Sequence, residues 1–468
     1  MHPLWTVAEA VAATGGRPEG LSDGPLHSVS IDSREIGPEA LFVAIKGDKL
    51  DGHDYVRAAL DAGAAAAIVS EAWFATNRSD RVIVVPDTLE ALRLMAKAAR
   101  LRSKAMFVAV TGSAGKTTTK EAIRTVLGAA GETHYSIKSF NNHWGVPLML
   151  ARMPREAQFG VFEIGMNHAG EITPLTRLVR PHVVVITTVA AAHLEFFKSV
   201  SEIAEAKAEI FLGVEEGGTA VLNADHPYLH ILFAKARESG IRKVITYGYD
   251  EEADWRIGEP ELAGARTFAR VTHGNDTLDL NLQVRGRHMV ANATAALAVA
   301  ALAGVDRYAA QRELADFGAP EGRGETTRLG PADKPLVLID ESYNANVASM
   351  NAAMEVFAGI HPPGGKKLLV LGDMLELGPQ GAELHQSLSK AVLGTGATQV
   401  FLVGRAIESL AEVLGDDRVT AKAWRVEDVM EPILSSLALG DAVMIKGSKG
   451  VRLALLIEAI KRRFAATT

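Results

Sequence analysis

The sequence predicts an α/β protein of three domains, at residues 1–104, 105–317 and 318–468. Its 468 residues are about three times the roughly 150 residues of an average domain. Short apolar runs alternate with helical patterns, which indicates mostly parallel sheets covered by helices. The rhythm restarts after a basic break at residues 102–104. It restarts again after residues 318–330, where Gly, Pro and charged residues indicate a linker.

The first domain reads as a small α/β unit. Apolar runs indicate its strands, an Ala- and Leu-rich pattern indicates its main helix, and turns are expected at Gly47 and at Asp51-Gly52. The expected elements are a helix at Trp5–Ala13, strands at Ala65–Val69 and Arg81–Val85, and a helix at Thr88–Leu101.

The second and third domains show a longer alternation of strands and helices. In the central domain we expect strands at Met106–Val110, Val161–Ile164, Val183–Thr187, Ala220–Leu222 and Lys243–Tyr247, and helices at Thr117–Ala130, Glu171–Val179 and Ser201–Val214. An antiparallel segment is expected at residues 255–285, before a helix at Val290–Leu302. Strands at Leu336–Asp340, Lys367–Leu371, Gln399–Val403 and Ala442–Ile445 predict a Rossmann-like C-terminal domain.

Composition and charge exclude several classes of protein. With 48% hydrophobic and 22% charged residues the chain is typical of globular proteins and not of disordered ones. The absence of cysteine excludes disulfides, thiolate nucleophiles and Cys-rich metal sites, so a metal would need oxygen or nitrogen ligands. A net charge of -7 offers no basic surface for nucleic acid.

No segment reads as a membrane anchor or export signal. Residues 1–16 lack the basic and apolar regions of a signal peptide. The most apolar long stretch, Met289–Val305, is mostly alanine, is interrupted by Asn292 and Thr294, and falls short of a span of about 20 residues. We therefore expect a cytoplasmic monomer whose partners are small molecules, without membrane insertion.

The strongest local signal is the segment MFVAVTGSAGKTTTK at residues 106–120. A buried strand leads into a short loop and then a helix start, with the residues Gly112, Ser113, Ala114, Gly115, Lys116, Thr117 and Thr118. Glycines let backbone N–H groups surround phosphate oxygens, and the helix N-terminus adds a positive dipole end. Lys116 would reach the β- and γ-phosphates and the Thr117 hydroxyl would hold Mg²⁺. Although two residues separate the glycines where the common pattern has four, a plain turn does not explain Lys-Thr-Thr, so the segment predicts a nucleotide site.

Three other polar residues each have two interpretations. Glu163 closes a strand at the carboxyl edge, where open α/β sheets bind ligands, but a solvent-facing carboxylate fits equally. His193 is either a metal ligand or a hydrogen-bonded loop residue, and Mg²⁺ prefers oxygen. Lys207 stands among glutamates on a predicted helix, which is typical of a solvated charged face.

Three more segments are equally open. Asn141 and Asn142 are typical turn formers. The segment DESYNAN at residues 340–346 follows a strand, and its Tyr and Asn side chains suit either a tight turn or contacts to a base. Arg323 is either a phosphate clamp between domains or a linker charge.

Taken together, these segments resemble the Mur ligase family over essentially the whole chain. The matching motifs are TGSAGKTT (111–118), NNHWGVP (141–147), EIGMNHAGEI (163–172), AHLE (192–195), AKAEIF (206–211), LNAD (222–225), GRHMVAN (286–292), SYNAN (342–346) and LGDMLELG (371–378). IDSR (31–34) and KGDKLDGHDY (46–55) are similar to the family segment that binds the UDP-sugar. Ile164, Met289 and Val347 depart from the usual family residues without removing a polar catalytic group.

The resemblance implies ATP-dependent amide formation in peptidoglycan synthesis, with an N-terminal UDP-sugar domain, a central ATP domain and a C-terminal ligase domain. It implies a carboxylate activated as an acyl phosphate, with ATP and Mg²⁺ as cofactors. The implied catalytic residues are Lys116, Asn142, His193, Lys207 and Arg323, the metal residues Thr117, Glu163, His193 and Lys207, and Lys207 is expected to be carbamylated. Asn292 and Asn344 are expected near adenine, Asp340 near the ribose, and Ser33, Arg34, Lys46, Asp51 and His53 at the UDP-sugar.

Within the family, LGDMLELG and SYNAN favour addition of D-alanyl-D-alanine to UDP-N-acetylmuramoyl-tripeptide. The alternatives are a Mur-type ligase that adds a single amino acid, a P-loop kinase, or a nucleotide-dependent regulatory module. Dependence of ATP hydrolysis on both acceptor substrates would separate them.

Overall fold

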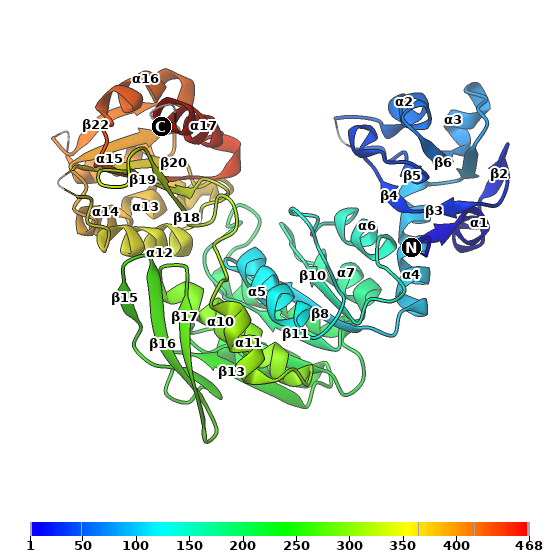
Figure 1. Cartoon of the computed structure of the whole chain (residues 1–468), viewed down its shortest axis with the longest axis horizontal. Helices are drawn as coiled ribbons and strands as arrows, with labels where there is room; N and C mark the ends of the chain where they lie inside the picture. Colours follow the sequence, from blue (N-terminus) through cyan, green and yellow to red (C-terminus); the bar gives the residue numbers. More distant parts are fainter. Residues whose placement is uncertain (1, 48, 364, 416, 466–468) are drawn as a thin grey trace.

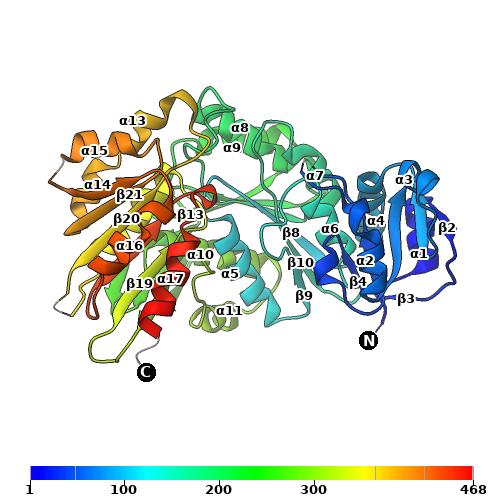
Figure 2. The ribbon, with the colours of Figure 1, turned by 90° about the horizontal axis from the view of Figure 1, so that it is seen from above.

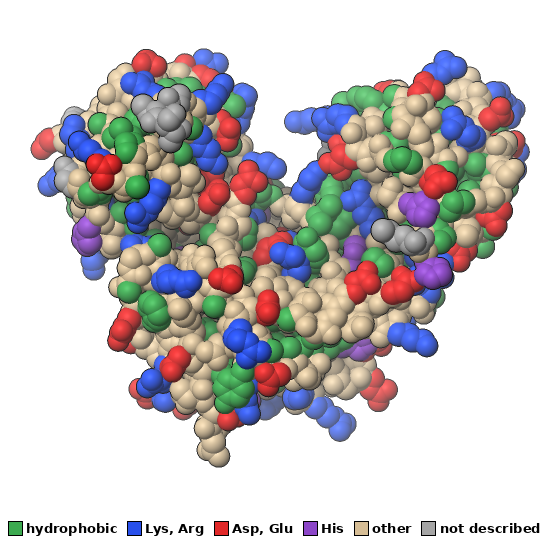
Figure 3. Space-filling model, viewed as in Figure 1, with side chains coloured by type: hydrophobic (Ala, Val, Ile, Leu, Met, Phe, Trp, Pro, Cys, Tyr) green, Lys and Arg blue, Asp and Glu red, His purple; other side chains and the backbone are tan. Residues whose placement is uncertain are grey.

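The structure, a computed structural model, describes residues 2–47, 49–363, 365–415 and 417–465. The chain forms a V in which the central part lies at the base and the two terminal parts form the arms (Figure 1). Seen from above, the three parts follow one another in a row (Figure 2). The space between the arms stays open when side chains are drawn, and Lys and Arg side chains border it on both arms (Figure 3).

The N-terminal part is built on a five-stranded sheet, parallel except for one edge strand. In sheet order the strands are β2 (Arg17–Glu19), β7 (Val82–Val85), β6 (Ala64–Ser70), β5 (Ala40–Val43) and β4 (Ser28–Ser30). The helices are α1 (Val7–Thr14), α2 (Val56–Asp61), α3 (Glu71–Thr76) and α4 (Thr88–Arg102). The first helix starts two residues later than expected, because Thr6 caps it and Trp5–Thr6 (β1) pair with Pro25–Leu26 (β3).

Polar contacts and helix packing join this part to the central one. The Trp5 indole N–H donates to the Ala151 carbonyl at 2.8 Å. Within the N-terminal part, the Arg102 guanidinium supports Trp5, since it lies 3.7 Å from the centre of the Trp5 ring and donates to the Leu4 carbonyl. Lys138 and Glu35 form an ion pair across the same junction. The N-terminal part is therefore held by directional contacts and by packing of α4 against α6 (Gly145–Ala151).

The central part contains a ten-stranded sheet whose core is parallel. Its strands in order are β15 (Glu261–Ala263), β16 (Arg266–His273), β14 (Trp255–Ile257), β13 (Lys243–Gly248), β12 (Thr219–Asn223), β11 (Val183–Ile186), β8 (Met106–Thr111), β10 (Phe159–Glu163) and β9 (Thr133–Tyr135), with β17 (Asp276–Leu282) paired to β16. The other helices are α5 (Lys116–Gly128), α7 (Ile172–Val179), α8 (Val200–Ala208), α9 (Leu229–Glu238), α10 (Arg287–Leu302) and α11 (Arg307–Leu314). The expected antiparallel segment at 255–285 is confirmed. The helix expected at Ser201–Val214 ends at Ala208 and continues as a 3-10 helix over Glu209–Gly213.

The most apolar long segment is a buried helix of this part. From Met289 to Ala300 every residue of α10 is buried, because the helix packs against α5 and the sheet. Within the described residues, no helix is both long enough and apolar enough to cross a membrane.

The C-terminal part has a six-stranded sheet that is parallel apart from its first strand. The strands in order are β18 (Glu325–Leu329), β19 (Leu336–Glu341), β23 (Ala442–Lys446), β20 (Lys367–Gly372), β21 (Gln399–Val403) and β22 (Val419–Ala423). The helices are α12 (Val347–Ala358), α13 (Gly381–Gln386), α14 (Ser389–Gly394), α15 (Glu408–Leu414), α16 (Val426–Ser436) and α17 (Ala454–Ala465). The prediction of a linker at residues 318–330 is wrong for the second half of that range. Residues 325–329 form edge strand β18, where two threonines and a buried Leu329 suit a half-buried strand.

Candidate active site

The loop between β8 and α5 is braced by the segment that follows β11. The Ser113 N–H donates to the Thr188 carbonyl at 2.8 Å, and the Ser113 hydroxyl bonds both the carbonyl and the N–H of Ala190. The Thr187 hydroxyl donates to the Ala114 carbonyl at 2.5 Å. Because residues 187–190 hold the loop through these hydrogen bonds, its conformation does not depend on a bound ligand.

Both positions in the loop need glycine, because the backbone has a positive φ and because a Cβ atom would meet a neighbouring side chain. Gly112 and Gly115 have φ values of 152° and 81°, in the region that favours glycine. A Cβ at Gly112 would collide with the Thr187 side chain, and a Cβ at Gly115 would lie 2.9 Å from Asn292 Oδ1. The shortened spacing between the glycines therefore still forms a tight strand-to-helix turn.

Two side chains donate hydrogen bonds to the carboxylate of Glu163, the last residue of β10. The Thr117 hydroxyl donates to one carboxylate oxygen at 2.8 Å, and the Asn141 amide donates to the other at 2.8 Å. Glu163 is 2% exposed. Lys116 donates to the Gly112 carbonyl at 2.7 Å, and burial lowers its pKa while nearby Glu163 acts to raise it. A hydroxyl and a carboxylate at a helix start suit a hard divalent cation.

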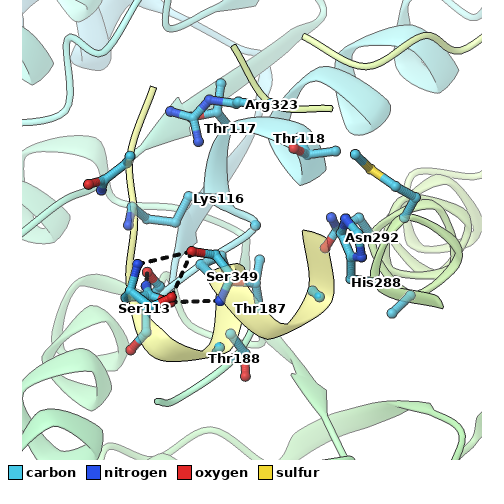
Figure 4. A pocket seen from close by; sticks show the side chains of 18 of the residues that line it. Ser113, Lys116, Thr117, Thr118, Thr187, Thr188, His288, Asn292, Arg323 and Ser349 are labelled. Atoms are coloured by element: carbon cyan, nitrogen blue, oxygen red, sulfur yellow. Dashed lines mark hydrogen bonds between the residues drawn. The ribbon is translucent and has the colours of Figure 1, made fainter. Parts of the chain in front are cut away.

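The loop opens into a cavity of about 640 Å³ that both the central and the C-terminal parts line. Figure 4 shows Lys116 and Thr117 on one side, Asn292 and His288 of α10 on another, and Ser349 of α12 beneath the loop. The lining residues include Ser113, Ala114, Gly115, Lys116, Thr117, Thr118, Glu163, Asn292, Arg323 and Asn344 from the predicted set. A cavity of this size accommodates a nucleotide.

The C-terminal part closes this cavity through polar contacts. The Asn346 amide donates to the Ser113 carbonyl at 3.0 Å, and its oxygen caps α12 through the Ser349 N–H. The hydroxyls of Tyr343 and Ser139 are in contact. Arg323 lies 4.2 Å from the centre of the Tyr343 ring, with no carboxylate paired to it among the described residues. The guanidinium is therefore available for an anion.

Residues on α10 form the end of the cavity away from Lys116. Asn292 accepts a hydrogen bond from Thr119 at 3.1 Å, and burial lowers the pKa of His288. Asp340, expected near the ribose, instead lines an adjoining cavity of about 700 Å³, where Ser342 donates to its carboxylate at 2.6 Å. The next residue, Glu341, lines the main cavity and pairs with Lys446. Since side chains alternate along β19, only one of two successive carboxylates can face each side.

His193 and Lys207 approach the site from different directions. His193 lines a smaller cavity of about 250 Å³ beside Ser113, and its Nδ1 lies 2.5 Å from Glu376 Oε2. The hydrogen bond with His193 lowers the pKa of Glu376. Lys207 is 2% exposed, so it does not belong to a solvated face. Burial lowers its pKa well below the ordinary value, and the charge of Lys116 lowers it further.

Asn142 does not line the main cavity. Its side-chain oxygen accepts the Gly145 N–H at 2.9 Å, at the start of α6. Asn141 takes the position beside Glu163 instead. Within the described residues no group of three or more His, Asp or Glu side chains forms a ready metal site. A cation here would depend on ligands outside the protein, as Mg²⁺ sites with nucleotide phosphates commonly do.

The residues expected at the UDP-sugar lie in the N-terminal arm, away from the main cavity (Figure 1). Ser33 and Arg34 form a 3-10 helix capped by Asp32, and Arg34 is also paired with Asp32 at 2.6 Å. The backbones of Lys46 and Asp51 pair as an isolated bridge.

His53 is buried in this arm. Its Nδ1 contacts Asp51 at 2.7 Å, and its Nε2 accepts the Ser70 N–H. Both ring nitrogens make internal hydrogen bonds, so His53 supports the loop that carries the predicted UDP-sugar residues.

Sequence reasoning missed several residues of the site. Thr187 is expected only at the end of a strand, and Asn346 only within a segment that suits a tight turn or contacts to a base. Glu376 was noticed only within a family motif, because nothing local links it to His193, 183 residues away. Thr187 and Thr188 could have been found, since they end a predicted strand at the ligand-binding edge.

Comparison with known proteins places the whole chain in one family. The family model of the Mur ligase middle domain matches residues 110–300, that of the Mur ligase glutamate ligase domain matches 322–449, and that of the Mur ligase catalytic domain matches 25–100. The chain is 33% identical to the UDP-N-acetylmuramoyl-tripeptide--D-alanyl-D-alanine ligase of Rickettsia prowazekii, over 92% of this chain and 94% of the relative. It is 32% identical to the Bacillus subtilis protein of the same name, over 97% and 96%.

Solved structures agree with this placement. A crystal structure of MurF from Acinetobacter baumannii superposes with a TM-score of 0.84 at 26% identity, covering 98% of this chain and 99% of the other. MurF ligase from Thermotoga maritima in complex with ADP superposes with a TM-score of 0.79 at 26% identity, covering 94% and 98%. The three-domain α/β fold expected from the sequence is thereby confirmed, and the chain belongs to the Mur ligase family of ATP-dependent ligases.

Proposed function

We propose that the protein adds D-alanyl-D-alanine to UDP-N-acetylmuramoyl-tripeptide, with ATP converted to ADP and phosphate, in peptidoglycan synthesis. The product is the UDP-N-acetylmuramoyl-pentapeptide. Full-length similarity to relatives that carry this name supports the choice of substrates. The observation that carries the proposal is the cavity shared by the phosphate loop and the C-terminal part, joined by the bond from Asn346 to Ser113.

The reaction needs an activated carboxylate, because an amine cannot expel oxide from a free carboxylate. The terminal carboxylate of the tripeptide attacks the γ-phosphorus of ATP, ADP leaves, and an acyl phosphate forms. The amine of D-alanyl-D-alanine then attacks the acyl carbon, loses a proton and expels phosphate. Lys116, the loop N–H groups and Arg323 stabilise the charge on the transferred phosphoryl group, so catalysis is mainly electrostatic and positional.

Mg²⁺ is part of the proposal. Thr117 and Glu163 would hold it through their oxygens, and bound there it would neutralise phosphate charge. His193 and a carbamylated Lys207 are proposed to assist. Lys207 suits carbamylation because only a neutral amine reacts with CO₂, and burial beside Lys116 favours the neutral form. Carbamylation would convert the Lys207 amine into an anionic oxygen ligand.

Each of the three parts is proposed to have a separate role. We assign residues 1–104 to the UDP-sugar, 105–317 to ATP and 318–468 to closure of the site around the reacting groups. Arg34, Lys46 and Ser33 are proposed to contact the UDP-sugar, with Asp51 and His53 shaping their loop. Asn292 and Asn344 are proposed to lie near adenine. We further propose that the enzyme acts as a monomer in the cytoplasm.

The test is phosphate release with a panel of acceptors. UDP-N-acetylmuramoyl dipeptide, the tripeptide and a folate acceptor are each offered alone, with a single amino acid and with D-alanyl-D-alanine. We expect release only with the tripeptide and the dipeptide co-substrate together. Release with ATP and one substrate alone would favour a kinase or regulatory module, and release with a single amino acid would favour another Mur-type ligase.

Lys116→Ala is expected to abolish ADP release in this assay. Lys116 is the residue of the loop that carries a full positive charge to the phosphates. The control is Lys97→Ala, which removes an exposed lysine from α4 outside the site. Near wild-type turnover by Lys116→Ala would contradict the assignment of the loop.

A further inference from the structure

A second contact joins the central and C-terminal parts beside the smaller cavity that Ser113 also lines. It brings the loop at residues 192–196 against the loop at residues 374–378. His193 Nδ1 lies 2.5 Å from Glu376 Oε2, and the Glu195 N–H donates to the Glu376 carbonyl at 3.1 Å. Gly378 fits against the same backbone, since a Cβ there would lie 3.0 Å from Glu195 Cα. The two loops therefore fit in shape and are joined by hydrogen bonds.

The two residues of the pair share an unusual backbone conformation. His193 has φ of 57° and Glu376 has φ of 64°, both in the left-handed region that non-glycine residues seldom occupy. Such conformations persist where surrounding contacts over-determine them, and they concentrate at functional sites. Here the strained residues face each other from different parts of the chain.

The contact leads directly to the phosphate loop. Three residues before His193, Ala190 exchanges two hydrogen bonds with the Ser113 hydroxyl, at 2.9 and 3.0 Å. The His193 ring also lines the 250 Å³ cavity, together with Ser113, Asn344 and Asn346. Its Nδ1 is engaged by Glu376, whereas the described residues provide no partner for Nε2.

We propose that Glu376 is a positioning residue that orients His193 when the C-terminal part closes. By holding Nδ1, the carboxylate directs Nε2 toward the reacting groups, as carboxylates do for functional histidines elsewhere. The same contact steadies the segment at residues 190–193 that braces Ser113. Closure of the C-terminal part onto the central part would thus orient the His193 ring at the same time. The role of His193 in turnover rests on the proposed function, whereas the contact between the loops does not.

The first experiment is a double-mutant cycle on turnover, with Glu376→Ala, His193→Ala and the pair. We expect Glu376→Ala to lower kcat by about 10- to 100-fold, as loss of a partner of a functional histidine does. KM for ATP should change little, because the nucleotide contacts are untouched. In the His193→Ala background, Glu376→Ala should cause no further loss. An equal loss in both backgrounds would show an independent structural role and overturn the proposal.

Two comparison variants sharpen this cycle. Glu376→Gln keeps an acceptor at the same position and should lose less activity than Glu376→Ala. Glu383→Gln makes the same chemical change on exposed α13, seven residues along, and should leave kcat unchanged. A loss from Glu383→Gln as large as that from Glu376→Gln would count against a specific role for the contact.

The second experiment measures the approach of the two loops by disulfide crosslinking, without measuring turnover. The chain has no cysteine, and a Cβ at Gly378 would lie 3.6 Å from Glu195 Cβ, within the range of about 3.5–4.5 Å for disulfides. Glu195→Cys with Gly378→Cys should therefore crosslink under oxidation. Because the φ of 61° at Gly378 strains a cysteine there, crosslinking rates are compared only among variants that carry both cysteines. Adding Glu376→Ala or His193→Ala should slow crosslinking by the same factor, and adding both should slow it no further.

An unchanged crosslinking rate with Glu376→Ala would overturn the proposal. This readout is separate from the proposed function. If the unaltered enzyme fails to use D-alanyl-D-alanine, the substrate assignment fails, while crosslinking still decides whether Glu376 and His193 act as one unit in closure.

Discussion

Replacement of Asn346 separates two tasks that this side chain performs at once. Its oxygen accepts the Ser349 N–H at 2.9 Å and caps α12, and its amide donates to the Ser113 carbonyl at 3.0 Å in the phosphate loop. Asn346→Asp retains the capping oxygen and removes the donor. Asn346→Ala removes both. The two variants therefore differ only in the cap.

The magnitudes follow from these two bonds. Loss of an Asn cap costs about 1 kcal/mol of stability. Loss of one hydrogen bond costs about 1 kcal/mol net, and more when a carboxylate is left facing a carbonyl oxygen. Since about 1.4 kcal/mol is a factor of ten in affinity, Asn346→Asp should weaken binding of an ATP analogue by roughly five- to twentyfold. Its unfolding midpoint should fall less than that of Asn346→Ala, because the cap of α12 is kept. Asn346→Ala should show both a lower midpoint and weaker binding.

Titration calorimetry with a non-hydrolysable ATP analogue measures the affinity, and circular dichroism during urea unfolding measures the stability. Asn351→Asp is the control, because Asn351 lies on the exposed side of α12 and bonds only within the helix. Wild-type affinity in Asn346→Asp would refute the reasoning, since it would mean that the contact with Ser113 contributes nothing to the nucleotide site.

Three further predictions concern other positions. Gly115→Ala should abolish binding of the ATP analogue, because its Cβ would meet Asn292 at 2.9 Å and its φ is 81°, whereas Gly128→Ala, in open space on α5, should bind normally. Lys207→Ala should be inactive and partly restored by short carboxylic acids, and no rescue together with no carbamate in bicarbonate labelling would remove support for carbamylation. Burial lowers the pKa of His226 to about 4, whereas the pKa of an unfolded histidine is about 6.5. Between these two pH values the unfolded chain binds more protons than the folded one. The free energy of unfolding should therefore fall as the pH drops from about 6.5 to about 4. Both ring nitrogens of His226 are buried, and the described part of the chain offers them no hydrogen-bond partner. His226→Leu should therefore reduce the pH dependence of stability, and an unchanged slope of urea midpoint against pH would contradict this.

Much of the fold and the nucleotide loop could be predicted from local patterns. The strand ending at Thr111, the tight turn and the helix beginning at Lys116 depend on neighbouring residues, so their spacing predicts them. Glu163 could be placed at the correct edge because parallel strands end together. The short edge strand β18 was missed, since its few residues take their conformation from pairing with β19.

Lys207 shows where local reasoning fails. Its neighbours in sequence are glutamates on an exposed face, yet its own side chain points inward and is buried near Lys116. Asn141 and Asn142 show the same limit, because the sequence offers two adjacent amides and only the fold decides which one meets Glu163. Asp340 and Glu341 repeat the pattern on β19.

By itself the sequence determined the α/β architecture, the phosphate loop, the family and the set of chemical groups available, including the absence of thiols. These properties follow from short-range spacing and composition. Only the tertiary structure decided which of those groups meet across domains: Asn346 with Ser113, and Glu376 with His193. The physical reason is that such contacts join residues nearly two hundred positions or more apart, and their partners are set by how the packed domains close and not by any local preference of the chain.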